Sequence, residues 1–386
     1  MIRWLLILAV VVPLATVAGS SKAAQKRAPV SAEFDVAPNG DFLLLPVIIN
    51  QREYPFLVST GIVTTVIDND LKKKLELTKL EPGGGAGRGG AGHERFGGLH
   101  AALGNIPLEF PDGVEAASFD AMRDKLDLEC FGEIGMDVLR RYVVQIDFDE
   151  GKLRLLSAVP AGAGESLKIT PMGAEGGAPL ISATFPGMPA EKFILHTSRA
   201  AHSLELTTEL YSRLIEKEKL AVLEKEKGVT RSAGVTYQAA RLQSVQIGKA
   251  RHDDLIVNTG EHNAVGLAYL ARYIVTLDLP RNRVYWKHGK HFDDRDSRLV
   301  LADVEIERDK DAVTIRDVPA YGPALRLGLR RGDVLETLDG HDARRFSNWH
   351  IRRTLAREQG PLSATVRRDG VKVELRSEPA QEADGK

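Results

Sequence analysis

The sequence is poor in cysteine and carries almost no net charge. Cys130 is the only cysteine among 386 residues, so no intramolecular disulfide can form and packing must stabilise the folded parts. Its place between "DKLDLE" and "FGEIG" predicts a buried, apolar role rather than a reactive one. The net charge of −1 gives the protein no long-range field, which argues against nucleic acid or an anionic membrane surface as a partner.

Patterns that bind metals or cofactors are also missing. The ten histidines include no pair with ligand spacing and a third partner. His288 and His291 form an isolated His-x-x-His beside Asp293 and Asp294, for which a solvated linker is a better interpretation than adventitious metal binding. The glycine-rich stretch 82–98 lacks the Gly-Lys-Ser/Thr ending of a phosphate loop. We therefore predict no metal and no cofactor.

One long apolar run is present, and it lies at the N-terminus. The charged start at residues 1–3 is followed by an apolar stretch over residues 4–18 and then by small residues, as in a secretory signal peptide. The run is short for a membrane span, although an uncleaved anchor is the alternative. We predict a signal peptide over residues 1–25 and an exported protein, in the periplasm, in the cell envelope or secreted. Membrane contact is expected only if the segment is retained.

Two pairs of similar segments organise most of the remaining chain. "FLVSTG", residues 56–61, matches "FILHTS", residues 193–198, and each ends an alternation of apolar stretches and turn signals. Residues 134–156 match residues 265–287 in a pattern of Gly, Leu, Arg-Tyr, apolar residues and Asp, and each copy ends in a hairpin. Counted from turn to glycine, the spacing is 76 residues in the first copy and 70 in the second. Chance does not explain the same two motifs at similar spacing.

We therefore predict two homologous β-rich lobes, over residues 36–160 and 165–290. One long helix over residues 207–228 interrupts the second lobe, with threonine caps at its start and Gly228 at its end. Its apolar positions are Leu210, Leu214, Leu220 and Leu223. The character of the chain changes near residue 300, where a strand, a Pro-Ala helix start, a Gly-Leu-x-x-Gly-Asp turn, a second helix and a closing hairpin follow.

On these motifs, residues 36–290 resemble the retropepsin-like aspartic peptidases in a tandem, single-chain arrangement. Residues 300–378 are similar to bacterial PDZ domains, on "GPALRLGLRRGD" followed by "LDG". In that match Gly328, Leu329, Gly332 and Asp333 form the typical turn. The resemblance implies a mainly β fold, with a two-lobed aspartic-protease-like part followed by an α+β PDZ domain. It also implies that the glycine-rich stretch and residues 228–242 carry flaps over a substrate cleft.

The resemblance further implies a catalytic carboxylate at the first residue of each turn. Such enzymes share one proton between two carboxylates, so that one acts as base and the other as acid on a water. Here the first turn begins with Ser59 and keeps Gly61, whereas the second begins with His196 and has Ser198 in place of glycine. The threonines that lock the two turns together in the family are retained, as Thr60 and Thr197.

Three interpretations of the two turns remain open. The first is a degenerate peptidase fold, because both acids are gone and Ser59 alone is not basic enough to activate water. The second is a Ser–His nucleophile pair, with Ser59 and His196 facing each other across the lobes. The third is displaced acids at Asp68 or Asp70, which we instead expect on the surface beyond the strand.

The sequence therefore favours a non-enzymatic function, a pseudopeptidase that binds extended peptides or protein segments. The former cleft and the groove of the PDZ-like part are the expected binding surfaces. An active aspartic-type endopeptidase, or a Ser–His hydrolase on the same scaffold, is the alternative.

Overall fold

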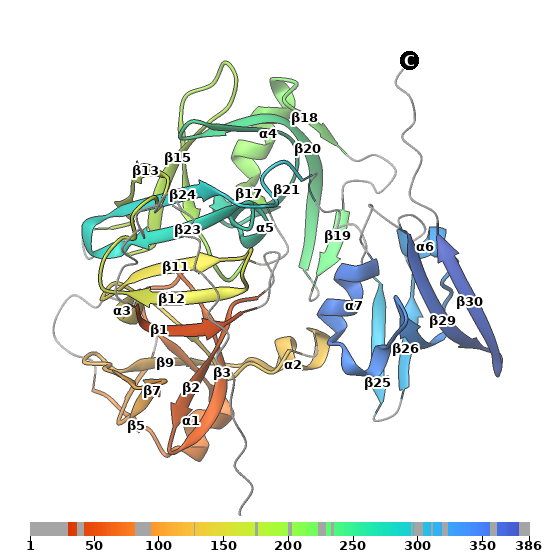
Figure 1. Ribbon diagram of the computed structural model, residues 1–386, viewed down its shortest axis with the longest axis horizontal. Helices are drawn as coiled ribbons and strands as arrows, with labels where there is room; N and C mark the ends of the chain where they lie inside the picture. The colour runs from red at the N-terminus through yellow and green to blue at the C-terminus, as the bar shows by residue number, and fades with distance from the viewer. Residues whose placement is uncertain are drawn as a thin grey trace, which may run out of the picture.

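The computed structural model describes residues 30–36, 42–81, 94–126, 128–173, 177–199, 203–222, 229–232, 235–294, 296, 304–309, 312–318, 323–355 and 361–377 (Figure 1). The predicted signal peptide, residues 82–93 of the glycine-rich stretch and the expected helix end at 223–228 lie outside this description. No helix in the described part of the chain is long and apolar enough to cross a membrane.

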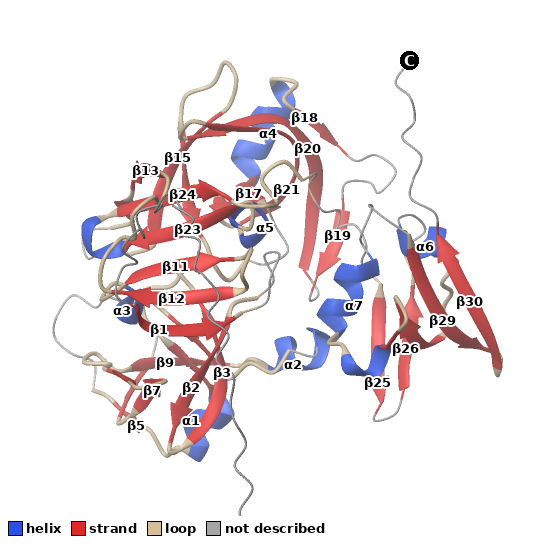
Figure 2. Ribbon diagram, viewed as in Figure 1, coloured by secondary structure: helices blue, strands red, loops and turns tan. Residues whose placement is uncertain are grey.

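The protein is built mainly from β-strands, arranged in four sheets (Figure 2). Two sheets form a first and a second lobe, the third lies between them, and the fourth belongs to a C-terminal unit, residues 304–377 (Figure 1). One hydrophobic core runs through both lobes and the central sheet, and a separate core fills the C-terminal unit. The predicted mainly β, two-lobed fold class is confirmed.

The first lobe holds a nine-stranded sheet. In spatial order its strands are β5 (Thr78–Lys79), β6 (Arg95–Gly97), β9 (Val114–Ala117), β4 (Val66–Asp68), β10 (Gly132–Ile134), β3 (Arg52–Val58), β2 (Leu44–Ile49), β7 (Ala101–Leu103) and β8 (Ile106–Leu108). Its helices are α1 (Asn69–Lys74), α2 (Asp120–Leu126) and α3 (Met136–Leu139). Strand β2 alternates buried and half-buried side chains, as a strand with one face on the core should.

The second lobe repeats this arrangement. Its strands in spatial order are β14 (Thr170–Pro171), β15 (Pro179–Thr184), β16 (Glu191–Leu195), β22 (Ala264–Val265), β17 (Leu204–Thr207), β21 (Ala250–Gly260), β20 (Val235–Ile247) and β18 (Leu220–Val222), with β19 (Val229–Ser232) also paired to β20. Its helices are α4 (Thr208–Glu216) and α5 (Leu267–Leu270). In each lobe the strand before the turn pairs in parallel with the short strand before the glycine: β3 with β10, and β16 with β22.

The central sheet carries the symmetry of the sequence repeat. Its order is β1 (Val30–Asp35), β12 (Lys152–Leu156), β11 (Val143–Asp147), β23 (Tyr273–Asp278), β24 (Arg283–His288) and β13 (Glu165–Lys168), with a 3₁₀ turn at Leu279–Arg281. Gln145 and Thr276, which are equivalent in the repeat, are direct partners across β11 and β23. A pseudo-two-fold axis therefore passes between them. The repeats predict that the first lobe begins at residue 36, but the described strands begin earlier, with β1. This strand is needed because it pairs with β12 at the edge of the central sheet.

The C-terminal unit packs two helices on a small antiparallel sheet. Its strands in order are β25 (Glu305–Asp309), β26 (Ala312–Asp317), β27 (Val334–Leu338), β29 (Leu362–Arg368) and β30 (Val371–Ser377), with β28 (His341–Asp342) beside β27. Its helices are α6 (Pro323–Leu327), the 3₁₀ turn Ala343–Arg345 and α7 (Asn348–Leu355). Helix α7 faces α2 of the first lobe (Figure 1).

The long helix predicted over residues 207–228 is wrong. Thr207 caps α4 as expected, but the helix ends at Glu216 and Glu218 takes a left-handed conformation with φ of 54°. The chain then forms β18, in which Leu220 pairs with Leu242 of β20. A sheet partner that supplies backbone hydrogen bonds outweighs the helix propensity of the Lys/Glu-rich segment.

Candidate functional site

The two turns lie at equivalent places, each at the end of a buried strand. The amide of Ser59 donates to the carbonyl of Ile134 at 2.9 Å, and the amide of His196 donates to the carbonyl of Val265 at 2.9 Å. The residue that follows β3 and the residue that follows β16 are therefore bound to the neighbouring short strand in the same way. Ser59 is fully buried, whereas His196 is half-buried.

Thr60 and Thr197 join the two turns through a reciprocal set of hydrogen bonds. The Thr60 amide donates to Thr197 Oγ1 at 3.0 Å, and the Thr197 amide donates to Thr60 Oγ1 at 3.2 Å. Thr197 Oγ1 donates to the carbonyl of Val58 at 2.7 Å, and Thr60 Oγ1 donates to the carbonyl of Leu195. Both threonines are buried, so these bonds satisfy polar groups that water does not reach.

Ser198 stands between Ser59 and His196. Its Oγ lies 3.2 Å from Ser59 Oγ and 3.3 Å from His196 Nδ1, so the link across the lobes passes through three side chains. A direct Ser59–His196 hydrogen bond, considered from the sequence, is not among those of the described residues. Ser198, which stands where the first turn has Gly61, supplies the intervening hydroxyl. The imidazole also lies against Gly61, where a Cβ would meet Nε2 at 2.1 Å, so only glycine fits beneath the ring.

His196 is held neutral. Burial lowers the pKa of His196 to about 3, and the positive charges of Arg199 and His262 act in the same direction. Within the described residues, no carboxylate is hydrogen-bonded to Ser59 or His196. The centre therefore offers hydroxyl groups and a neutral imidazole, and lacks the pair of carboxylates that would share a proton.

The surface location predicted for Asp68 is wrong, although Asp70 is exposed as expected. Asp68 is only 2% exposed: its Oδ1 accepts from the amides of Asp70 and Leu71, and its Oδ2 accepts from Phe119 and from Arg123 at 3.0 Å. Its carboxylate thus caps α1 and holds α2, and is fully engaged away from the turns.

Sequence reasoning missed Arg199 and Glu205, which lie beside the second turn. The carbonyl of Arg199 accepts from the amide of Leu267 at 2.8 Å, as the carbonyl of Ile62 accepts from Met136 in the first lobe. A cation therefore occupies the place of an isoleucine. Glu205 is 2% exposed, and burial raises the pKa of its carboxyl while the charge of Arg199 opposes that rise. The available signal was the arginine itself, two residues after Thr197.

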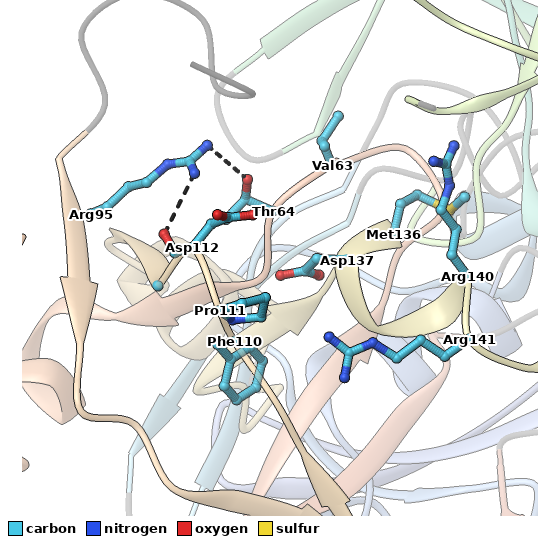
Figure 3. A pocket seen from close by; sticks show the side chains of 11 residues that line it. Val63, Thr64, Arg95, Phe110, Pro111, Asp112, Met136, Asp137, Arg140 and Arg141 are labelled. Carbon is cyan, nitrogen blue, oxygen red and sulfur yellow. Dashed lines mark hydrogen bonds between the residues drawn. The ribbon is translucent and has the colours of Figure 1, made fainter. Parts of the chain in front are cut away.

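A cavity of about 240 Å³ lies in the first lobe beside the segment that leaves the Ser59 turn (Figure 3). Its walls have an apolar part and three arginines. The lining residues are Val63, Thr64, Arg95, Phe110, Pro111, Asp112, Gly113, Met136, Asp137, Arg140 and Arg141. Asp137 accepts from the amide and hydroxyl of Thr65 at 2.9 and 2.8 Å, and burial raises its pKa. Arg141 is paired with Glu109 at 3.3 Å. The cavity is thus amphipathic, with its charges largely balanced.

The predicted turn residues of the C-terminal unit form a tight connection after α6. Gly328 and Gly332 both have φ of 89°, a conformation that favours glycine, and Leu329 is buried. Asp333 accepts two hydrogen bonds from Arg368 at 2.8 Å and one from the amide of Arg330. These residues therefore stabilise the turn.

Of the two histidines predicted to lie in a solvated polar linker, His288 is instead the exposed last residue of β24, and His291 follows that strand. His288 ends β24 and stacks on Phe292 with a ring separation of 3.6 Å, and His291 Nδ1 lies 2.7 Å from Asp294. Within the described residues, no group of three or more His, Cys, Asp or Glu is placed to hold a metal ion. Cys130 is buried, as predicted.

Comparison with known proteins gives a likeness only among solved structures. No family model matches the chain, and no curated protein matches it. The crystal structure of an aspartic proteinase from Irpex lacteus is similar at 13% identity and a TM-score of 0.40, covering 68% of this chain and 99% of that one. Basic 7S globulin from soybean is similar at 13% identity and a TM-score of 0.40, covering 68% of this chain and 97% of the globulin. At this identity the likeness says nothing about which side chains stand in the site.

Proposed function

We propose that this chain is an exported pseudopeptidase, with a two-lobed aspartic-peptidase-like scaffold and a C-terminal PDZ-like unit, that binds extended peptide segments. The observation that carries the proposal is the set of side chains in the two turns. Their interlocking threonines are in place, while Ser59 and a neutral His196 stand where the mechanism needs two carboxylates. The scaffold is thus retained without its acid and base.

Two features support peptide binding. The cavity beside Val63 and Thr64 has an apolar wall and polar donors, as a pocket for a side chain of an extended peptide requires. In the C-terminal unit, β25 is paired only with β26 among the described strands, so its other edge can accept an added strand. Helix α7 flanks β25, and Arg308 links them by donating to Asn348 Oδ1 at 3.3 Å.

The test measures cleavage and binding on the same material. Protein beginning at residue 26 is incubated with a complex peptide library from about pH 3 to 8, and products are read by mass spectrometry. Retention of intact peptides is measured in parallel. We expect retention without cleavage in the wild type, in Ser59→Ala and in His196→Ala. Cleavage that persists in both variants would place a different active site elsewhere and overturn the proposal.

A Ser–His hydrolase is the second candidate, favoured only by the Ser59–Ser198–His196 hydrogen-bond chain. It requires His196 to accept a proton, which the lowered pKa of His196 opposes. Hydrolysis that is lost in both alanine variants would establish this function in place of the first.

A further inference from the structure

The guanidinium of Arg95 lines the first-lobe cavity and has no carboxylate partner among the described residues. Arg95 lies on β6 and is half-buried. Its hydrogen bonds go to Thr64 Oγ1 and to the carbonyl of Asp112, both at 3.5 Å, beyond the usual range of about 2.7–3.2 Å (Figure 3). Glu115 lies opposite Arg95 on β9, and no ion pair of the described residues joins the two. A partly desolvated cation with only these neutral acceptors is incompletely satisfied, and an anion in the cavity would complete it.

A second cation, Arg141, lines the same cavity from the end of α3 (Figure 3). Its carboxylate partner is Glu109, at 3.3 Å, and it also donates to the carbonyl of Glu109 at 3.0 Å. The side chain of Glu109 is 78% exposed and is not part of the cavity wall. An exposed ion pair contributes little to stability, so a ligand carboxylate can take the place of Glu109.

The two aspartates of the cavity wall do not neutralise its three arginines. Asp137 Oδ2 accepts from the amide of Thr65, and Oδ1 accepts from the Thr65 hydroxyl and from the amide of Val138 at 2.9 Å. This carboxylate is therefore engaged by the backbone beside it. Asp112 is exposed, where water screens its charge. The balance of charge around the cavity depends on Glu109, and the wall itself has an excess of positive charge.

The cavity has a fixed base and the size of one side chain. The carbonyl of Val63 accepts from the amide of Asp137 at 2.9 Å, which ties the segment leaving the Ser59 turn to α3. Pockets for drug-sized ligands measure about 300–1,000 Å³, and this cavity is smaller, at about 240 Å³. Phe110, Pro111 and Met136 form its apolar wall, beside which a charge–charge interaction is stronger than in water.

We propose that the first-lobe cavity binds the side-chain carboxylate of an Asp or Glu of the peptide ligand, so that the protein selects acidic peptides. Arg95 is its direct partner, and Arg141 supplies the second positive charge. This inference rests on the proposed peptide-binding function and specifies which peptides that function selects. The carboxylate comes from a side chain, because an extended peptide turns single side chains toward a surface in alternation and a cavity of this size holds one.

The experiment uses three matched pools of N-acetylated octapeptides with otherwise equal random composition. The first pool has a central Glu and an amidated C-terminus, the second a central Gln and an amidated C-terminus, and the third a central Gln and a free C-terminus. Dissociation constants are measured for protein beginning at residue 26. We expect the Glu pool to bind at least about tenfold more tightly than either Gln pool, the scale of one charge-assisted hydrogen bond.

Four substitutions test the assignment to this cavity. Arg95→Gln should reduce the preference for Glu over Gln to less than about threefold, and Arg95→Lys should retain more of it. Glu109→Gln should strengthen the preference about two- to threefold, because it removes the carboxylate that competes for Arg141. Arg283→Gln is the matched control: this exposed arginine of β24 donates to Ser166 Oγ at 3.0 Å, lies outside the cavity wall, and should leave the preference unchanged.

The outcomes separate this inference from the function on which it rests. Equal binding of the Glu pool and the amidated Gln pool would overturn the acidic preference and leave peptide binding standing. An advantage confined to the pool with a free C-terminus would show that a terminal carboxylate is recognised, and would also overturn it. A preference as strong in Arg95→Gln as in Arg283→Gln would place the anion site elsewhere and overturn the assignment. No binding of any pool would overturn both proposals.

Discussion

Thr60 and Thr197 hydrogen-bond the turn of the first lobe to the turn of the second lobe. Each hydroxyl accepts from the other turn's backbone and donates to a carbonyl of the opposite strand. Both side chains are at most 1% exposed. The polar groups they satisfy have no access to water, so the hydroxyls matter more than the methyl groups that a valine would preserve.

Thr60→Val should lower the free energy of unfolding by about 1 to 3 kcal/mol, because it leaves a buried amide and a buried carbonyl unpaired. Urea unfolding followed by far-UV circular dichroism measures this. Thr184→Val, at an exposed position of β15, is the matched control and should change stability by less than about 0.5 kcal/mol. A Thr60→Val protein as stable as the control would show that the interlocking bonds are not stabilising.

His252 should make the protein less stable as the pH falls below neutrality. Its Nε2 lies 2.6 Å from the hydroxyl of Tyr273, and burial, with the charges of Arg272 and His288, lowers the pKa of His252 to about 4 against the weaker opposing effect of Asp253. The unfolded chain binds a proton at this residue near pH 6.5 and the folded chain only near pH 4, so stability is lost as the pH falls through that window.

His252→Gln keeps a hydrogen-bonding group and removes the titration. The fall in the free energy of unfolding between pH 7 and pH 5 should therefore be smaller than in the wild type by about 1 to 2 kcal/mol. The exposed His100→Gln should leave the fall unchanged. If the free energy of unfolding fell equally with pH in the wild type and in His252→Gln, the imidazole would have the same pKa in the folded and unfolded chains.

At the scale of elements, short helices and strands depend on caps and partners that lie far away in sequence. Helix α1 has only six residues and begins at the cap Asp68, whose second oxygen reaches Arg123 and Phe119 near α2. A helix this short is not stable by propensity alone. Its cap and its burial against the sheet therefore determine whether it forms.

Asp68→Ala should destabilise the first lobe by about 2 to 4 kcal/mol, since it removes the cap of α1, leaves the amide of Phe119 without its acceptor and takes from Arg123 one of its acceptors. Asp68→Asn can still cap the helix and should cost less than half as much. Asp70→Ala, two residues further along the chain and exposed, is the control and should be nearly neutral. Thermal unfolding of the three variants distinguishes them, and equal melting temperatures for Asp68→Ala and Asp70→Ala would contradict the assignment.

At the scale of the whole molecule, an aromatic contact between described residues joins the C-terminal unit to the first lobe. Trp349 on α7 is 6% exposed and belongs to the core of the lobes rather than to that of its own unit. Its ring lies 4.7 Å from that of Phe42. The next residue, Leu43, accepts from the amide of Val58 at 2.9 Å, so this contact adjoins the strand that carries Ser59.

Trp349→Ala should release the C-terminal unit without unfolding either part, because the remaining core of that unit does not include the indole. We expect a larger radius of gyration in small-angle scattering and two thermal transitions in place of one. Leu325→Ala, at an exposed position of α6, should leave the scattering unchanged. A Trp349→Ala protein with the wild-type radius would show that other contacts hold the two parts together.

Local signals in the chain predict much of this architecture. The repeated Gly135 and Gly266 precede short helices with nearly the same backbone angles, and the repeats around them become β11 and β23. The two copies place similar residues at the same relative positions, so the repeated sequence encodes a repeated local fold. That positions 59 and 196 hold a serine and a histidine rather than carboxylic acids is likewise evident without coordinates.

By itself, then, the sequence determined the two-lobed β fold, the place of the two turns and the absence of a carboxylate at positions 59 and 196. Only the tertiary structure decided that Ser198 links Ser59 to His196 and that Asp68 is buried. It also decided that Trp349 packs in the hydrophobic core of the lobes and not in that of the C-terminal unit. It also decided that Arg199 lies against a buried Glu205. The physical reason is the same in each case: these contacts join residues from separate elements, and their energies depend on burial and distance that no local pattern specifies.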